Sequence, residues 1–118
     1  MDDLYYQLVR EFLASNKAEA LAWLRAGSDT SFRNLGEMEA DDSVAFVQRL
    51  YDLGAEKVLA VEIDEDSDGA NTGHLLVQLP ADDAARERLF AFERDHAESH
   101  GFDATPDEGQ EYLYLKLD

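Results

Sequence analysis

The chain has 118 residues and a mass of 13.3 kDa, with 27 Asp and Glu against 10 Lys and Arg, so its formal net charge is −17 at pH 7. A surface of this sign repels the phosphates of nucleic acids and anionic membranes, so we expect neither as a partner. Apolar residues make up 45% and aromatic residues 10%, a composition that supports a folded core and differs from that of disordered acidic segments. At this length we expect one domain over residues 1–118.

The absence of certain residue types and patterns excludes further kinds of site and of protein. Without cysteine, the chain has no disulfides and no thiolate zinc or iron–sulfur site. No run of about 18 apolar residues occurs, and Asp2 and Asp3 stand where a secretory signal is basic. We therefore expect a cytoplasmic protein.

The first 27 residues carry two helical patterns. Apolar residues recur at helical spacing from Leu4 to Leu13, which predicts an amphipathic helix. Asn16, with Glu19 three residues later, resembles a capping box and predicts a second helix that ends at Gly27. The sequence thus predicts an N-terminal helical hairpin (1–27) that packs on residues 32–118.

Residues 32–118 alternate between strand and helix patterns. The first predicted elements are a weak edge strand at 32–38 and a helix that begins at Asp41 or Asp42 and ends at Gly54. Strands at 57–63 and 75–79 follow and should pair as a hairpin. A helix that begins at Asp82 or Asp83 and ends at Gly101 and a strand at 112–117 complete the order. This order is that of a ferredoxin-like βαββαβ antiparallel sheet in the α+β class. Both helices of such a fold cover one face of the sheet.

The connection between the two hairpin strands contains the most specific motif, Asp64-Glu65-Asp66-Ser67-Asp68-Gly69. Its D-x-D-x-D-G spacing matches the first half of an EF-hand loop, in which alternate carboxylates bind Ca²⁺ and the glycine permits a sharp turn. Asp64, Asp66 and Asp68 are therefore candidate ligands for weakly bound Ca²⁺ or Mg²⁺, and no other cofactor is indicated. The twelfth position is Leu75 in place of the bidentate Glu, which favours an acidic loop without a specific metal.

A second candidate metal site lies on the predicted long helix. His96 and His100 are four residues apart, and Glu93 precedes them by one turn, a spacing that can bind zinc or nickel. The alternative is that His96 is a half-buried helix residue and that His100 complements the negative end of the helix.

Aromatic residues mark one face of the predicted sheet. Tyr112 and Tyr114 alternate with the leucines of the last strand, and the hairpin should place Glu62 on the same face. Together with Glu65 of the acidic loop, these are the candidate partner-binding residues. Either the N-terminal helices fold over this face and complete the core, or part of it stays open for a partner protein, a small ligand or a second copy in a homodimer.

Nucleotide-binding and nucleophile motifs do not occur in the sequence, so we do not expect an enzyme. We expect a non-catalytic acidic domain that binds a basic protein partner, as small inhibitor and immunity proteins do. The alternative is a regulatory domain that responds to a cation or small ligand through the loop Asp64–Asp68. A third explanation for 15 Asp against three Lys is adaptation to high salt or simple solubility.

Overall fold

The computed structural model describes residues 3–28, 32–66 and 69–117. Its elements are, in chain order, α1 (Asp3–Ala14), β1 (Ala18–Glu19), α2 (Ala20–Arg25), β2 (Phe32–Leu35), α3 (Ala40–Asp52), β3 (Lys57–Val61), β4 (Asp64–Glu65), β5 (Gly69–Thr72), β6 (His74–Gln78), α4 (Asp83–Ser99) and β7 (Tyr112–Lys116). This mixture of helices and mainly antiparallel sheet confirms the α+β class. Within these three ranges, no helix is long and apolar enough to cross a membrane.

The main sheet has the strand order β1-β3-β6-β7, and each neighbouring pair is antiparallel. The predicted pairing of the hairpin strands is confirmed, with Val58 of β3 opposite Val77 of β6. On the other side of β6, Leu113 of β7 lies opposite the same Val77. These apolar residues share one face of the sheet because side chains alternate along each strand.

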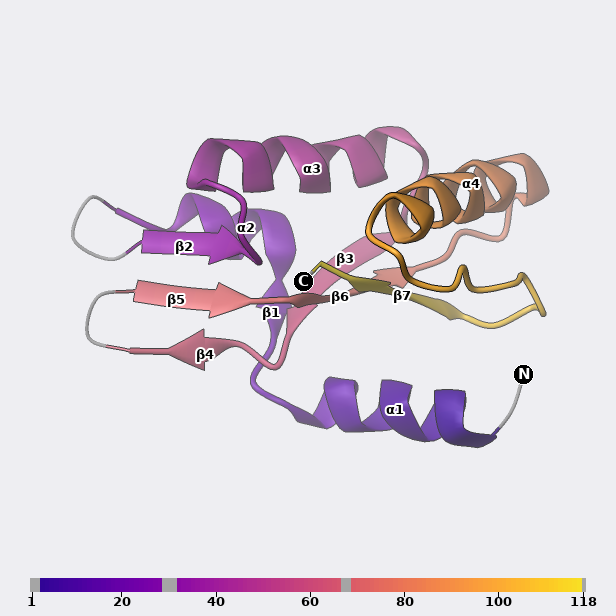
Figure 1. Cartoon of the computed structure of the whole chain (residues 1–118), viewed down its shortest axis with the longest axis horizontal. Helices are drawn as coiled ribbons and strands as arrows, with labels where there is room; N and C mark the ends of the chain where they lie inside the picture. Colours follow the sequence, from indigo (N-terminus) through magenta and orange to yellow (C-terminus); the bar gives the residue numbers. More distant parts are fainter. Residues whose placement is uncertain (1–2, 29–31, 67–68, 118) are drawn as a thin grey trace.

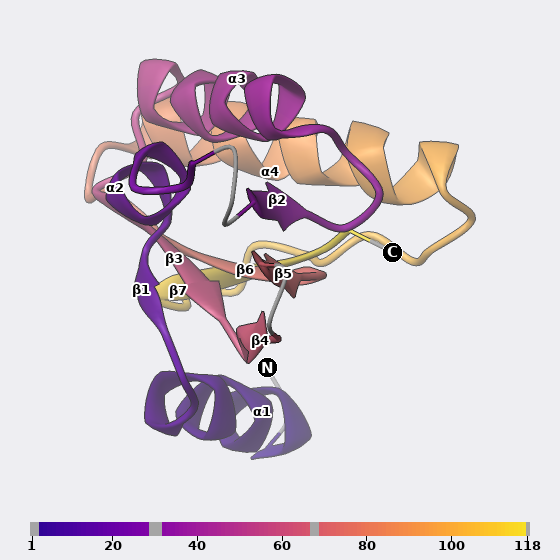
Figure 2. The same cartoon turned by 90° about the vertical axis from the view of Figure 1, so that its left-hand side faces the viewer.

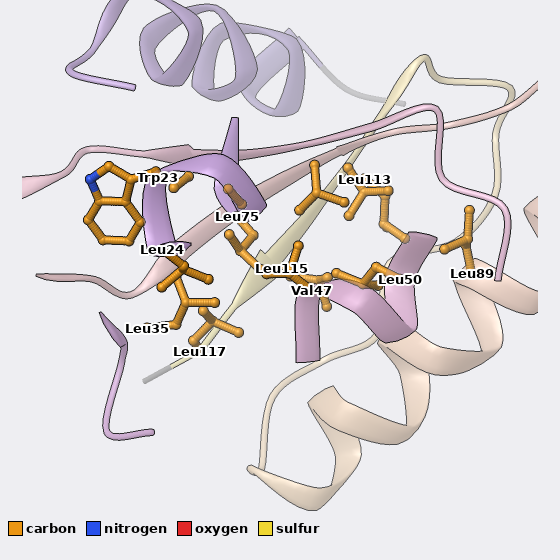
Figure 3. Close-up of a cluster of buried hydrophobic side chains, with 14 of the residues drawn as sticks. Trp23, Leu24, Leu35, Val47, Leu50, Leu75, Leu89, Leu113, Leu115 and Leu117 are labelled. Carbon is orange, nitrogen blue, oxygen red and sulfur yellow. The ribbon is translucent and has the colours of Figure 1, made fainter. Parts of the chain in front are cut away.

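Helices cover both faces of this sheet. The helices α2, α3 and α4 lie on one side and α1 lies on the other (Figures 1 and 2). The larger core lies beneath the three helices, where Leu50 of α3 and Leu89 of α4 pack with Leu75 and Leu115 of the sheet (Figure 3). A smaller buried cluster, made by Val9, Phe12, Val61 and Leu76, lies beneath α1.

Residues 3–27 differ from the helical hairpin that the sequence predicts over residues 1–27. The short strand β1 stands between the two helices and pairs with β3, so the chain crosses the edge of the sheet and α1 and α2 end on opposite sides (Figure 2). Asn16 is not the N-cap of α2; its Nδ2 donates to the carbonyl of Ile63 (3.1 Å). The helix α2 begins at Ala20, and Glu19 is its N-cap.

The side chain of Glu19 fixes this crossing point. Its carboxylate accepts from the N–H groups of Leu21 (3.0 Å) and Ala22 (2.8 Å) and from the hydroxyl of Tyr51 in α3 (2.6 Å). Burial raises the pKa of Glu19, but these hydrogen bonds outweigh it and leave the pKa below its ordinary value. Burial and the Glu19 carboxylate raise the pKa of Tyr51 to about 12.

The predicted ferredoxin-like topology is not confirmed. The strand predicted at 32–38 exists as β2 but lies outside the main sheet, in a second sheet of order β2-β5-β4. There β2 runs parallel to β5, and both β4 and β5 arise within the segment predicted to be a loop. In addition, β7 pairs directly with β6 and runs antiparallel to it, although α4 lies between the two strands in the chain. The unit β6-α4-β7 is therefore not the parallel βαβ crossover that the predicted fold requires.

Candidate binding face

The acidic loop belongs to the second sheet. Asp64 and Glu65 form the exposed strand β4, and Asp66 closes the turn to β5. The backbone N–H of Asp66 donates to the carbonyl of Gly69 (2.8 Å), and its Oδ1 accepts from the N–H of Gly69 (2.9 Å). Asp68 lies outside the described residues. Among the residues that the structure describes, no group of three or more His, Asp or Glu is placed to hold a metal ion.

The structure brings two of the candidate partner-binding residues together through a histidine. His74 Nδ1 lies 2.6 Å from the hydroxyl of Tyr114, and its Nε2 lies 3.5 Å from the carboxylate of Glu62. Glu62 has a left-handed backbone (φ 48°), and its N–H donates to Ser15 Oγ (2.9 Å). Glu65 is exposed on β4 and belongs to the second sheet instead.

The face that carries Tyr112 and Tyr114 is covered by α1. The hydroxyl of Tyr5 donates to the carbonyl of Tyr112 (2.8 Å) and accepts from the N–H of Tyr114 (3.2 Å). The ring of Phe12 lies 5.0 Å from that of Tyr114 and 5.3 Å from that of His74, between centroids. Both tyrosines of β7 are half-buried, and burial raises the pKa of Tyr112. Of the two N-terminal helices, α1 therefore covers the tyrosine face, whereas α2 packs on the opposite one.

A row of five rings crosses the opposite side of the molecule, where α3 meets the C-terminal half of α4. We call it the aromatic row; its members are Phe92, Phe46, His96, His100 and Phe102. Three successive centroid separations, 5.3, 5.4 and 6.2 Å, lie within the range of favourable ring contacts. The rings of His96 and His100 lie closer, at 4.3 Å. The row therefore forms a continuous ring surface from α3 to the segment that follows α4.

The end of α4 places the last ring of the row. Gly101 adopts φ 77°, its N–H donates to the carbonyl of Glu98, and the N–H of Phe102 donates to the carbonyl of Ala97 (2.8 Å). This pair of bonds is a Schellman motif, which turns the residue after the glycine back onto the helix. The ammonium of Lys116 lies 4.5 Å from the centroid of the Phe102 ring, a cation–π contact.

The two histidines of the row hydrogen-bond to backbone carbonyls and do not converge on a metal. His96 Nε2 lies 3.0 Å from the carbonyl of Lys116, and His100 Nδ1 lies 2.9 Å from the carbonyl of His96. These nitrogens carry the ring hydrogen, because a carbonyl only accepts. In the neutral rings, His96 Nδ1 and His100 Nε2 are therefore acceptors. Burial lowers the pKa of His96 and favours its neutral form.

Three hollows adjoin one another along this side of the molecule. The first (about 560 Å³) lies at the turn from β2 to α3, the second (about 600 Å³) lies at the aromatic row, and the third (about 370 Å³) lies between α4 and β7. The first and second share Glu37 and Met38, and the second and third share His96 and Phe102. We call this continuous surface the binding face.

The binding face combines an apolar floor with acidic walls. Phe32 is 60% exposed in the first hollow, beside the half-buried Met38. The acids at this end are Glu37, Glu39 and Asp41, all exposed. The guanidinium of Arg33, which lines the same hollow, donates to the carbonyl of Trp23 (3.0 Å) and lies over the Trp23 ring.

The third hollow contains a buried carboxyl group. Glu93 is only 4% exposed, and its Oε1 accepts from the N–H of Thr105 (2.7 Å), which ties the segment after α4 to the helix. Burial raises the pKa of Glu93, although the Thr105 hydrogen bond and the charge of Arg94 oppose the shift. Ionisation of Glu93 therefore destabilises the folded chain.

The Glu93→Gln variant should melt at a higher temperature than the wild type near pH 8 and at the same temperature near pH 4. A raised folded-state pKa contributes stability below the unfolded pKa of Glu, and this stability is lost as pH rises through the folded pKa. The glutamine amide keeps an oxygen for Thr105 but does not ionise. Thermal unfolding of both proteins across this range measures the difference. A difference in melting temperature that stays constant with pH would show that ionisation of Glu93 does not cause it.

Sequence reasoning missed the aromatic row and His74. The helical periodicity of α4 predicts one apolar stripe of Ala85, Leu89, Phe92 and His96; Ala85 and Leu89 are indeed buried, whereas Phe92 and His96 are half-buried in the aromatic row. Phe102 could have been found, since an apolar residue directly after a helix-ending glycine often packs back on the helix. No local signal links His74 to Tyr114, which lies 40 residues away.

No family model, curated protein or solved structure matches this chain.

Proposed function

We propose that this chain is a non-catalytic acidic domain that binds a basic protein partner through the binding face. The observation that carries the proposal is the exposed Phe32 in a hollow walled by three acids and continuous with the aromatic row. Large apolar side chains at the centre of an interface supply most of its affinity, and charges around them select the partner.

The charge arrangement favours a basic partner over a neutral one. The net charge of −17 attracts cations over the whole surface and raises the association rate of a basic protein. At the binding face itself, Arg33 is engaged with Trp23 and Lys116 with Phe102, so both cations that line it are already in contact with the chain. A partner's lysines and arginines would therefore meet carboxylates and ring faces.

A peptide that alternates lysine with leucine should bind in a titration monitored by fluorescence anisotropy. Replacing Glu37, Glu39 and Asp41 with Gln, Gln and Asn should weaken its binding about ten-fold, because each paired charge contributes on the order of 0.5–1 kcal/mol. All three side chains are exposed, and that of Glu39 makes no capping hydrogen bond to α3, so the variant should still fold and lose only the modest contribution of these charges to the N-terminus of α3.

A matched variant controls for net charge. Replacing Glu62, Asp64 and Glu65 with Gln, Asn and Gln removes the same number of charges from residues that line none of the three hollows, at and before β4, the edge strand of the second sheet opposite β2. This variant should weaken binding of the peptide less than about two-fold. Equal losses in both variants would mean that attraction is diffuse and that the binding face has no part in it. No binding of the peptide at low salt would overturn the proposal.

A further inference from the structure

We propose that the second hollow of the binding face receives the side chain of a lysine from the partner, with its ammonium group on the aromatic row. This inference rests on the proposed function and names the residue that the partner inserts.

The shape and lining of the hollow suit a long alkyl chain that ends in a cation. Its walls are Met38, Phe46, Leu117 and the rings of His96, His100 and Phe102, and its volume is about 600 Å³. A lysine side chain buries its four-carbon stem on apolar surface and keeps its ammonium at a polar boundary. The faces of aromatic rings attract such a cation electrostatically.

The polar groups of the hollow are acceptors. His96 Nδ1 and His100 Nε2 carry no hydrogen when the rings are neutral, because the other nitrogen of each ring binds a backbone carbonyl. Glu37 adds an exposed carboxylate at the wall shared with the first hollow. An ammonium brings three donors and no acceptor, so it complements this set of groups, whereas an anion or a hydrogen-bond acceptor does not.

The chain already places one ammonium on this ring surface. Lys116 Nζ lies 4.5 Å from the centroid of Phe102, reached from the third hollow. The contact demonstrates that the environment of Phe102 accepts a primary ammonium. It also means that Lys116 competes with an incoming lysine for the last ring of the row.

The test uses a small probe, Nα-acetyl-lysine N-methylamide, and follows the ring resonances of Phe102 and His100 by NMR. The probe should bind and shift both resonances, and its neutral isostere, Nα-acetyl-norleucine N-methylamide, should bind about three-fold more weakly or not at all. The corresponding arginine derivative separates a lysine site from a general cation site: weaker binding of the arginine derivative supports the lysine assignment, and equal or tighter binding would overturn it.

Two substitutions act on the same ring in opposite directions. Phe102→Leu should weaken binding of the lysine probe about three-fold. Lys116→Met should strengthen binding of the probe by a similar factor, because the substitution frees the ring of its internal cation. Phe32→Leu, in the first hollow, is the matched control and should leave the probe unaffected. Melting temperatures check that each variant folds.

The outcomes separate this inference from the proposed function. If the lysine–leucine peptide binds but the lysine probe shifts neither ring, or if lysine and norleucine derivatives bind equally, the inference is wrong and the proposed function stands. If Phe32→Leu weakens binding of the peptide and Phe102→Leu weakens binding of the peptide and of the probe, the proposed function and the inference are both supported. If neither peptide nor probe binds, both are wrong.

Discussion

Replacing Phe12 with Ala is expected to lower the free energy of unfolding by about 3–4 kcal/mol, the usual cost of removing a buried phenylalanine ring. Phe12 is 3% exposed and belongs to the small cluster that joins α1 to the sheet. Its ring contacts those of His74 and Tyr114. Loss of the ring leaves a cavity at the centre of this contact, so the effect should fall mainly on α1.

Urea unfolding checks this expectation with two signals. The only tryptophan, Trp23, lies in the core on the opposite face of the sheet and reports on that core by fluorescence, whereas circular dichroism also detects α1. In the Phe12 variant the dichroism transition should precede the fluorescence transition, because α1 detaches first. Leu4→Ala is the control in the same helix: Leu4 is 76% exposed, and its loss should cost less than about 0.5 kcal/mol. Equal effects of the two substitutions would contradict the packing of α1 on the sheet.

Replacing Gly69 with Ala should separate β2 from β5 and destabilise the chain by about 2–3 kcal/mol. A Cβ atom at Gly69 would overlap the carbonyl oxygen of Phe32, which belongs to the backbone and cannot rotate away. The two strands would have to move apart, and their four paired positions would be lost. Because β2 carries Phe32, the first hollow of the binding face should be lost with it.

The backbone amide resonance of Phe32 and the melting temperature measure this effect, and the affinity for the lysine–leucine peptide should fall in parallel. Gly101→Ala separates steric overlap from backbone strain. Gly101 has φ 77°, and a methyl group on its Cα would meet no atom within 4 Å, so its replacement should cost only about 1 kcal/mol. If Gly69→Ala is as mild as Gly101→Ala, the close approach of β2 and β5 is not required for stability.

The local elements of this fold follow from sequence periodicity, because each pattern lies within one continuous segment. The helices near Leu8, Leu50 and Leu89 and the strands at Val58 and Leu113 all have an apolar repeat that matches their geometry. The hairpin of β3 and β6 follows from their alternation and short separation in the chain.

The arrangement in space could not be obtained in this way. The strand β1 consists of Ala18 and Glu19, too short for a periodic signal, yet it sends α1 and α2 to opposite faces. Gly69 fits the glycine of a calcium loop in sequence, but its structural role is to admit the backbone of Phe32, which lies in a distant segment of the chain. The aromatic row likewise joins α3, α4 and the segment after α4. Such pairings depend on packing between distant segments, which no local pattern records.

The hydroxyl of Tyr5 also bears on the exposed border of the main sheet. At the two ends of β7, Glu111 and Leu117 bond to the residues that flank β6, so the backbone groups of Tyr112 and Tyr114 point outward, where another strand could add. Tyr5 engages one carbonyl and one N–H of this border from α1, and His96 engages the carbonyl of Lys116 from α4. A foreign strand would have to displace side chains from both helices before it could extend the sheet. The helices α1 and α4, on opposite faces of the sheet, thus together protect β7 from edge-to-edge aggregation.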